Sequence, residues 1–470
     1  MATSLSGIAA ARRPAPSTLG AICIAILALL AAIGAIMLAG TKTGFALAML
    51  AVLGPVCAYS ALTAPLVFPF ALFVLLVPFD NLLGFSSFGT VTKLVAIMSG
   101  AALVLYLVRT RRIAIPDRQT FLWWGAFALW VILSLMWAID PAYGATRVAT
   151  LLQLMALYAA ISLMPVDRRA LGWLVAAIIA SGVLAGGYGA YLFHSGVDVS
   201  KDGRLFMADA DTLIDPNQFA AALILPLTLA LMAAVSVRRM SVRIALLLAL
   251  LVLGGGVAVA GSRGAFLAIL AALIYLMVRS RKRLAIAGVA FGGIGIALAM
   301  YSNVLTRFSN AASTGGAGRE DIWKVGLAAF REHPIFGYGF GNFPYAFDQA
   351  FMLVSQNYYT RWHRAAHDIL ISTSVELGIV GLILLFGAAW KQFRSLRVIP
   401  DTDPLFSLRL AIEAGMIGLF FASLFLDTLT TKYFWLLFML AAMTRNAALQ
   451  PGGLPGEANI SPVLQTRSDG

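Results

Sequence analysis

The sequence predicts an all-α, polytopic integral membrane protein with about 12–14 transmembrane helices. Of its 470 residues, 60% are hydrophobic and only 12% are charged, and the mean hydropathy is +0.88. An ordinary soluble globular protein has an apolar share nearer one half. Because a helix needs roughly 20 residues to cross a bilayer, the chain has room for that number of spans. Its long continuous apolar runs exclude a transmembrane β-barrel, whose strands alternate in polarity.

The expected spans form one transmembrane domain, residues 19–449. The segment before it, 1–18, contains Arg12 and Arg13 and is expected to stay in the cytoplasm. The first apolar run is too long for a signal peptide, and no convincing cleavage site follows it. The expected spans are 19–39, 44–62, 65–79, 91–108, 120–138, 145–163, 170–193, 217–236, 244–260, 264–278, 284–302, 366–389, 407–427 and 432–447. Residues 450–470, rich in proline and glycine, are expected to be a disordered cytoplasmic tail.

The basic residues set the expected orientation. In a soluble protein the net charge of +13 would indicate nucleic-acid binding, but here the basic residues lie in short clusters between spans. With a cytoplasmic N-terminus, 21 of the 34 Lys and Arg residues fall in cytoplasmic segments, as the positive-inside rule requires. Apart from a few isolated ones, the others gather at Lys201–Arg204, at Arg263 and in one large loop, 303–364. The loop is therefore expected on the periplasmic side.

Cysteine and tryptophan carry structural expectations. Cys23 and Cys57 both lie within apolar spans, so neither a disulfide nor a metal site is expected of them. Four tryptophans of the expected span 120–138 are expected to be mainly interfacial aromatic residues. These are Trp123, Trp124, Trp130 and Trp137.

The stretch Gly315–Glu376 is the longest polar interval of the chain. It holds three of the four histidines, namely His333, His363 and His367. Within it, Arg319–Glu332 predicts an amphipathic helix suited to a membrane surface. Pro334 is expected to end that helix. The glycines that follow predict a flexible, tightly turning link; they are Gly337, Gly339 and Gly341.

Two arginines outside this interval are candidate phosphate ligands. Arg263 lies in a short turn between two spans, where Gly261 and Gly264 let backbone approach a ligand. A guanidinium offers planar, two-pronged donors suited to phosphate oxygens, although an interfacial arginine can also reach the headgroups without such a role. Arg204 is the second candidate. It precedes Asp215, an expected helix N-cap followed by proline.

His367 is the candidate general base. It precedes an apolar helix, which would hold it rigidly at the membrane boundary, as a base requires. The alternative without a catalytic role is a histidine at the membrane interface that makes one hydrogen bond. Asp368 either orients the imidazole and raises its pKa or caps the helix. His363, four residues earlier, could share a helical face with His367 and is expected to contact substrate or to be a spectator. A zinc site on these two histidines is disfavoured, because no cysteine or third histidine lies nearby.

Four patterns between roughly residues 200 and 390 resemble the bacterial O-antigen ligase and O-antigen polymerase superfamily. They are the helix start Pro216-Asn217-Gln218-Phe219-Ala220, the turn Gly261-Ser262-Arg263-Gly264, Gly318-Arg319 followed by Trp323, and His367 opening a helix that runs to Glu376-Leu377-Gly378. The run His333-Pro334-Ile335-Phe336-Gly337-Tyr338-Gly339 is also typical of the family. In the family the histidine usually precedes asparagine, and this chain has Asp368 instead.

The resemblance implies a membrane glycosyltransferase of the C-type fold in the bacterial inner membrane. Its donor would be a polyprenyl (undecaprenyl) diphosphate-linked glycan, and its acceptor either lipid A-core or a second lipid-linked glycan. Arg263, Arg319 and Arg204 would bind the diphosphate and His367 would be the catalytic base; His363, Arg364 and Asp368 are possible substrate contacts. No cofactor and no metal are expected. An O-antigen or exopolysaccharide polymerase of the same superfamily stays open, as does a transporter or flippase of lipid-linked sugars.

Overall fold

The computed structural model describes residues 57–82, 84–85, 89–196, 205, 207–209, 212–300, 319–354 and 363–450. The chain divides into two units, Met1–Ala64 and Pro65–Gly470. The described part of the first is the short helix Cys57–Thr63 with the residue after it.

The second unit is built from helices. In chain order they are η1 (Leu66–Phe70), α3 (Ala71–Leu76), η2 (Val77–Leu82), α4 (Val91–Thr110), α5 (Arg118–Leu133), η3 (Ser134–Trp137), α6 (Pro141–Ser162), α7 (Arg168–His194), α8 (Pro216–Ala222), α9 (Ile224–Ser236), α10 (Met240–Ala260), α11 (Arg263–Arg279), α12 (Arg283–Met300), α14 (Arg319–Glu332), α15 (Phe343–Val354), α16 (Ile369–Ser395), η5 (Leu396–Val398), α17 (Phe406–Ser423) and α18 (Lys432–Leu449). Two short antiparallel hairpins join them. The hairpins are β1 (Gly84–Phe85) with β2 (Gly89–Thr90), and β3 (Met207–Asp209) with β4 (Thr212–Ile214).

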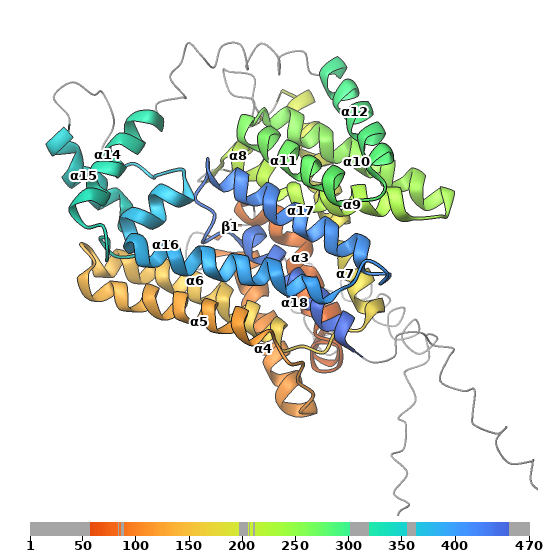
Figure 1. The fold of residues 1–470 in the computed structure, drawn as a ribbon, viewed down its shortest axis with the longest axis horizontal. Helices are drawn as coiled ribbons and strands as arrows, with labels where there is room; N and C mark the ends of the chain where they lie inside the picture. Colours follow the sequence, from red (N-terminus) through yellow and green to blue (C-terminus); the bar gives the residue numbers. More distant parts are fainter. Residues whose placement is uncertain are drawn as a thin grey trace, which may run out of the picture. The chain divides into compact units, whose positions relative to one another are not determined.

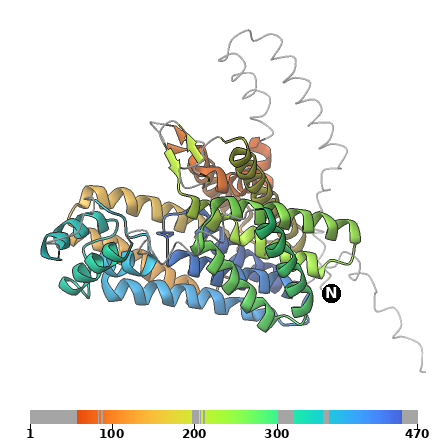
Figure 2. The same ribbon diagram turned by 90° about the horizontal axis from the view of Figure 1, so that it is seen from above.

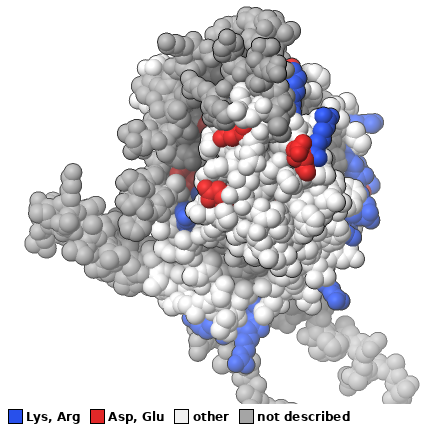
Figure 3. Space-filling view, turned by 90° about the vertical axis from the view of Figure 1, so that its left-hand side faces the viewer, with Lys and Arg blue, Asp and Glu red and all other residues white. Residues whose placement is uncertain are grey.

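The prediction of an all-α membrane protein is confirmed. Within the described ranges, eight helical segments are long and apolar enough to cross a bilayer, and each coincides with an expected span. Three further expected spans, 264–278, 284–302 and 432–447, correspond to α11, α12 and α18. The face in Figure 3 is largely uncharged, with a few isolated acidic and basic side chains. The expected spans 19–39 and most of 44–62, and the tail 450–470 beyond its first residue, lie outside the described residues.

The expected span 65–79 is not one continuous helix. It is divided into η1, α3 and η2, and Phe68 has extended dihedral angles (φ −149°, ψ 129°) within η1. The residue after Phe68 is Pro69, whose ring disfavours the helical conformation for the residue before it. The prolines of this segment therefore end the helical run that its apolar residues favour.

The helices pack in layers around α18. Residues Phe434–Met443 of α18 are all buried, as expected of a helix that is apolar on every side. α16 packs along α5, and α17 packs between α9 and α11; α5, α6 and α16 run side by side in Figure 1. α14 and α15 lie at one end of this layer (Figures 1 and 2).

One expected interfacial tryptophan belongs to this core. Trp124 is 2% exposed, and its ring lies 4.9 Å from that of Trp435 and 5.2 Å from that of Phe438. The interfacial assignment was wrong for Trp124, because the helix that carries it presents this face to α18 rather than to lipid. Trp130 and Trp137 lie at the other end of α5, beside the loop that carries the candidate site.

Buried charge in the core is paired. Arg409 is one of the 21 basic residues expected in cytoplasmic segments, but it lies inside α17 and is 6% exposed. Its Nε lies 2.9 Å from Oε1 of Glu413, and the hydroxyl of Tyr275 donates to Oε2 of the same carboxylate over 2.6 Å. Ionisable side chains within a bilayer are stable when they are paired in this way.

Candidate functional site

The helix that follows His367 is broken, and the break receives the loop after α14. Gly378 has φ 66° and ψ −168° in the middle of α16. At this break Tyr338 N donates to Val375 O (2.9 Å), and Gly339 N donates to Glu376 O (2.8 Å). Ile379 N donates to Pro334 O over 2.9 Å. The segments 334–339 and 375–379 therefore form one hydrogen-bonded unit.

The glycines of the loop are held in place by packing. A Cβ at Gly378 would lie 2.0 Å from Ile335 O, and one at Gly339 would lie 2.5 Å from the Ala138 Cβ. Trp130 of α5 also holds the hydrogen-bonded unit in place, because its Nε1 donates to Leu377 O over 3.0 Å. The expectation of a flexible link was wrong, because the positive φ angles of these glycines serve close backbone approach rather than mobility.

A helix that the sequence analysis missed follows this loop. α15 begins where Glu376 Oε1 accepts a hydrogen bond from Phe343 N over 3.1 Å. Asn342 precedes it, and its side-chain Oδ1 accepts from Asp140 N over 2.7 Å. The spacing of Phe343, Ala346, Phe347 and Ala350 is the pattern of one helical face and could have revealed the helix.

The bounds predicted for α14 are confirmed, but its expected place on a membrane surface is not. Ile322, Val325 and Ala329 are at most 1% exposed. They pack in one cluster with the apolar face of α15 and with Val375 of α16. Protein therefore covers the apolar face of α14, which brings Arg319, its first residue, to the start of α16.

Arg263 lies at a helix start prepared by its neighbours. Gly261 ends α10 in a left-handed conformation (φ 57°, ψ 34°), and Ser262 caps α11 through its Oγ, which accepts from Ala265 N over 3.3 Å. Arg263 is then the first residue of α11 and is partly buried. A Cβ at Gly264 would lie 2.9 Å from the ring of Phe425, so this position has room only for glycine. The predicted turn is confirmed.

Asp368 is the helix cap of α16. Its Oδ1 accepts from Leu370 N (2.7 Å) and from Ile371 N (3.0 Å). His367 precedes this cap with φ 48° and is half-buried. Of the two roles considered for Asp368, the structure shows the cap, and it fixes the backbone on which His367 is carried.

The charges of four segments meet at His367. Burial lowers the pKa of the His367 imidazole, Arg319 lowers it further, Asp215 opposes them, and Arg364 adds a smaller lowering. Burial also lowers the pKa of Arg319, which experiences the charges of Asp215, Arg263 and, more weakly, Asp368. The starts of α8, α11, α14 and α16 therefore bring Asp215, Arg263, Arg319 and His367 into one electrostatic neighbourhood.

Asp215 is the member of this group that the sequence analysis assigned to capping alone. It does cap α8, because Oδ1 accepts from Asn217 N over 2.8 Å. Its charge also reaches both Arg319 and His367. Nothing in the local sequence signals the second role, since His367 lies far along the chain.

One candidate lies outside the described residues, and another stands apart from the group. Arg204 lies outside the described residues. His363 shares no helical face with His367, because its φ is 56° and residues 363–367 are not helical. Its Nδ1 lies 2.5 Å from Oδ2 of Asp348, and its backbone N donates to Oδ1 of the same residue over 2.8 Å. Arg364 belongs to the neighbourhood of His367, and its buried Nε has no hydrogen-bond partner among the described residues.

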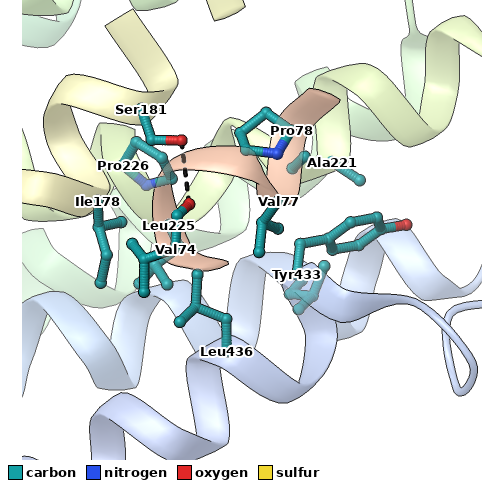
Figure 4. A pocket seen from close by; sticks show the side chains of 12 residues that line it. Val74, Val77, Pro78, Ile178, Ser181, Ala221, Leu225, Pro226, Tyr433 and Leu436 are labelled. Carbon is teal, nitrogen blue, oxygen red and sulfur yellow. Dashed lines mark hydrogen bonds between the residues drawn. The ribbon is translucent and has the colours of Figure 1, made fainter. Parts of the chain in front are cut away.

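A small cavity in the helical core differs in chemistry from this group. It lies among η2, α7, α8, α9, α17 and α18, and aliphatic side chains line most of it (Figure 4). Ser181 Oγ donates to Leu75 O over 2.9 Å, which satisfies the one serine at its wall. Tyr433 is the one ionisable residue of its lining, so the charged neighbourhood of His367 is the candidate active site. In the described ranges, no three His, Cys, Asp or Glu side chains are grouped as metal ligands would be.

Comparison with known proteins agrees with the resemblance in the sequence. Residues 247–386 match the O-antigen ligase family, a range that contains Arg263, Arg319, Arg364, His367 and Asp368. Over 179 residues the chain is 27% identical to an O-antigen ligase of Pseudomonas aeruginosa. That alignment covers 36% of this chain and 41% of the relative. The chain is therefore a polytopic membrane protein in which residues 247–386 are similar to the O-antigen ligase family.

Proposed function

We propose that this chain is a glycosyltransferase that moves a polyprenyl diphosphate-linked glycan to an acceptor sugar hydroxyl on the periplasmic face of the bacterial inner membrane. The observation that carries the proposal is the position of Arg319 at the start of α14, within electrostatic reach of both Arg263 at the start of α11 and His367 just before α16. The similarity of the chain to an O-antigen ligase favours ligase-like transfer in the synthesis of surface polysaccharide. Lipid A-core is then the acceptor.

The arginines suit the diphosphate of the donor. Arg263 and Arg319 each occupy the first position of a helix, where backbone N–H groups also favour anions. Negative charge builds on the diphosphate as the glycosidic bond breaks, and fixed cations stabilise that charge. Arg204 is retained as a third ligand of the diphosphate in this proposal.

His367 suits proton removal from the acceptor. Burial and the neighbouring arginines hold its pKa below the ordinary value, so the neutral imidazole that can accept a proton predominates near neutral pH. The acceptor hydroxyl attacks the anomeric carbon as His367 takes its proton, and the diphosphate leaves. A single displacement of this kind inverts the anomeric configuration. Diphosphate is a good leaving group, so the proposed route contains no metal-dependent step.

A polymerase of the same superfamily differs only in its acceptor, which would be a second lipid-linked repeat unit. A transporter of lipid-linked sugars is the alternative from another class. Transporters place polar sites at broken helices, and α16 is broken at Gly378. The cationic residues, however, lie at helix starts and not at this break, which favours transfer.

The test compares the glycans of a strain that lacks this chain, separated by size and by lipid carrier. Long polymer left on the polyprenyl carrier, with bare lipid A-core, indicates a ligase. Single repeat units, on the carrier or on core, indicate a polymerase. If neither the carrier-linked nor the core-linked glycans change, O-antigen transfer is contradicted. An exopolysaccharide polymerase or a transporter of lipid-linked sugars then remains.

Purified variants then test the site. Arg263→Ala should lower transfer about 100-fold or more, as loss of a transition-state charge partner does. His367→Ala should lower it by a similar or larger factor through loss of the base. Arg331→Ala and His333→Ala change exposed residues of the same loop and serve as matched controls. Normal transfer by the first two variants would refute the mechanism.

A further inference from the structure

A row of aromatic and ionisable side chains runs along the surface beside the candidate active site. The rings of Tyr143 and Tyr345 meet edge to face with centroids 5.5 Å apart. Tyr345 in turn meets the ring of His363 edge to face at 4.9 Å. Arg147 ends the row on one side, where its guanidinium lies 5.5 Å from the centre of the Tyr143 ring. The row therefore joins α6, α15 and the segment that leads to His367.

Hydrogen-bonding groups line this row. The Tyr345 hydroxyl bonds to Asp140, and Arg147 Nη2 donates to the Tyr143 hydroxyl over 3.0 Å. The Asp348 carboxylate pairs with His363. Each carboxylate has several acceptor positions, and each tyrosine hydroxyl can both donate and accept, so capacity is left for further hydrogen bonds.

Packing of the loop does not account for the row. The apolar face of α15, with Phe343, Ala346 and Phe347, already anchors the helix to α14 and α16. Tyr345 and Asp348 lie on the other side of α15 and are partly exposed, and the His363 side chain is 57% exposed. Aromatic residues that keep one part apolar and another hydrated are enriched at recognition surfaces.

The position of the row relative to the base limits what could bind there. His363 precedes His367 by four residues, so their Cα atoms lie no more than about 14 Å apart even in an extended chain. Figures 1 and 2 place α15, which carries Tyr345, apart from α8 and α11, the helices that bring Asp215 and Arg263. A sugar chain whose reacting hydroxyl is at His367 could thus extend over the row while the diphosphate occupies the arginines.

We propose that Tyr143, Tyr345 and His363 form a binding subsite for the acceptor oligosaccharide. The ring faces would contact the C–H face of a sugar, and Asp140, Asp348 and Arg147 would bond its hydroxyls. This inference rests on the proposed function, because it takes His367 as the base that receives the acceptor hydroxyl.

The test measures equilibrium binding to the full-length protein in detergent. Two probes are used: the core oligosaccharide released from the lipopolysaccharide of the native strain, and the repeat-unit oligosaccharide released from its polymer. One of them should bind the wild-type protein, and which one does distinguishes a lipid A-core acceptor from a second repeat unit. Tyr345→Ala and Tyr143→Ala should each weaken that binding about tenfold, which corresponds to the loss of one well-packed contact.

Matched variants separate recognition from folding. Tyr345→Phe keeps the ring and should retain most of the affinity, whereas Tyr191→Ala removes an exposed tyrosine of α7 and should change nothing. Binding of neither probe to the wild-type protein, or equal binding by both alanine variants, overturns the subsite. His367→Ala separates the two proposals. If it still transfers glycan while the tyrosine variants lose binding, the proposed base is wrong and the subsite stands.

Discussion

Glu376 in α16 accepts a hydrogen bond from the backbone N–H of Phe343, which lies 33 residues earlier in the chain. The carboxylate is 5% exposed and supplies an acceptor at the N-terminus of α15. The same residue accepts from Gly339 N through its backbone carbonyl. Glu376 therefore fastens the loop to the helix that begins at the candidate base.

Loss of this acceptor should destabilise the loop. Glu376→Ala leaves Phe343 N without its buried partner, at a cost of about 1–3 kcal/mol. Glu376→Gln keeps an oxygen at the same place and should cost less. Thermal unfolding in detergent and hydrogen exchange of α15 measure the two effects. Equal protection of α15 in all three proteins would show that the hydrogen bond contributes nothing.

Gly378→Ala should disrupt the pairing between the loop and α16. An added Cβ would lie 2.0 Å from Ile335 O, and the φ of 66° is itself unfavourable for alanine. The expected result is a loss of several kcal/mol or failure to accumulate in the membrane. Gly172→Ala is the control, because a Cβ there meets nothing within 4 Å. It should be neutral or raise stability by up to about 1 kcal/mol.

The pH dependence of transfer should report the charges around His367. Arg364 lowers the pKa of His367, so Arg364→Gln should raise it and move the acid limb of activity to higher pH. Asp215 raises that pKa, so Asp215→Asn should move the acid limb to lower pH. Asparagine also caps helices well, which keeps α8 intact. Profiles of kcat/KM against pH measure both shifts, and shifts of the same sign in the two variants would contradict the arrangement.

Asp368→Asn should preserve both fold and transfer. Asparagine can accept the same two backbone hydrogen bonds at the N-cap. Asp368→Ala should cost about 0.5–2 kcal/mol through the lost cap. Thermal unfolding and the transfer rate of both variants decide the point. Loss of transfer in a stable Asp368→Asn protein would assign the carboxylate a chemical role.

Local sequence predicted the elements whose determinants are local. Apolar runs predicted the spans from 91–108 onward, and Asp215 was correctly predicted as a helix start. α14 was predicted because its apolar residues recur with helical spacing. The break at Gly378 was missed, because it depends on the backbone of Ile335 and Phe336, more than forty residues away.

Within the candidate site, Arg263, Arg319 and His367 were found through residue type and motif. Asp215 was assigned only a cap, because its charge reaches Arg319 and His367 through the tertiary fold and not through neighbouring sequence. His363 was given a helical face that its positive φ excludes. The residues that meet only in three dimensions are the ones that sequence reasoning could not supply.

The hydrogen bonds between segments 334–339 and 375–379 limit which segments can be exchanged between related proteins to make chimeras. A chimera that replaces the loop 319–354 alone would put foreign residues against the break in α16. A chimera should therefore fold only when the crossover lies beyond Ile379. The loop, His367 and the helix break at Gly378 then come from the same parent protein.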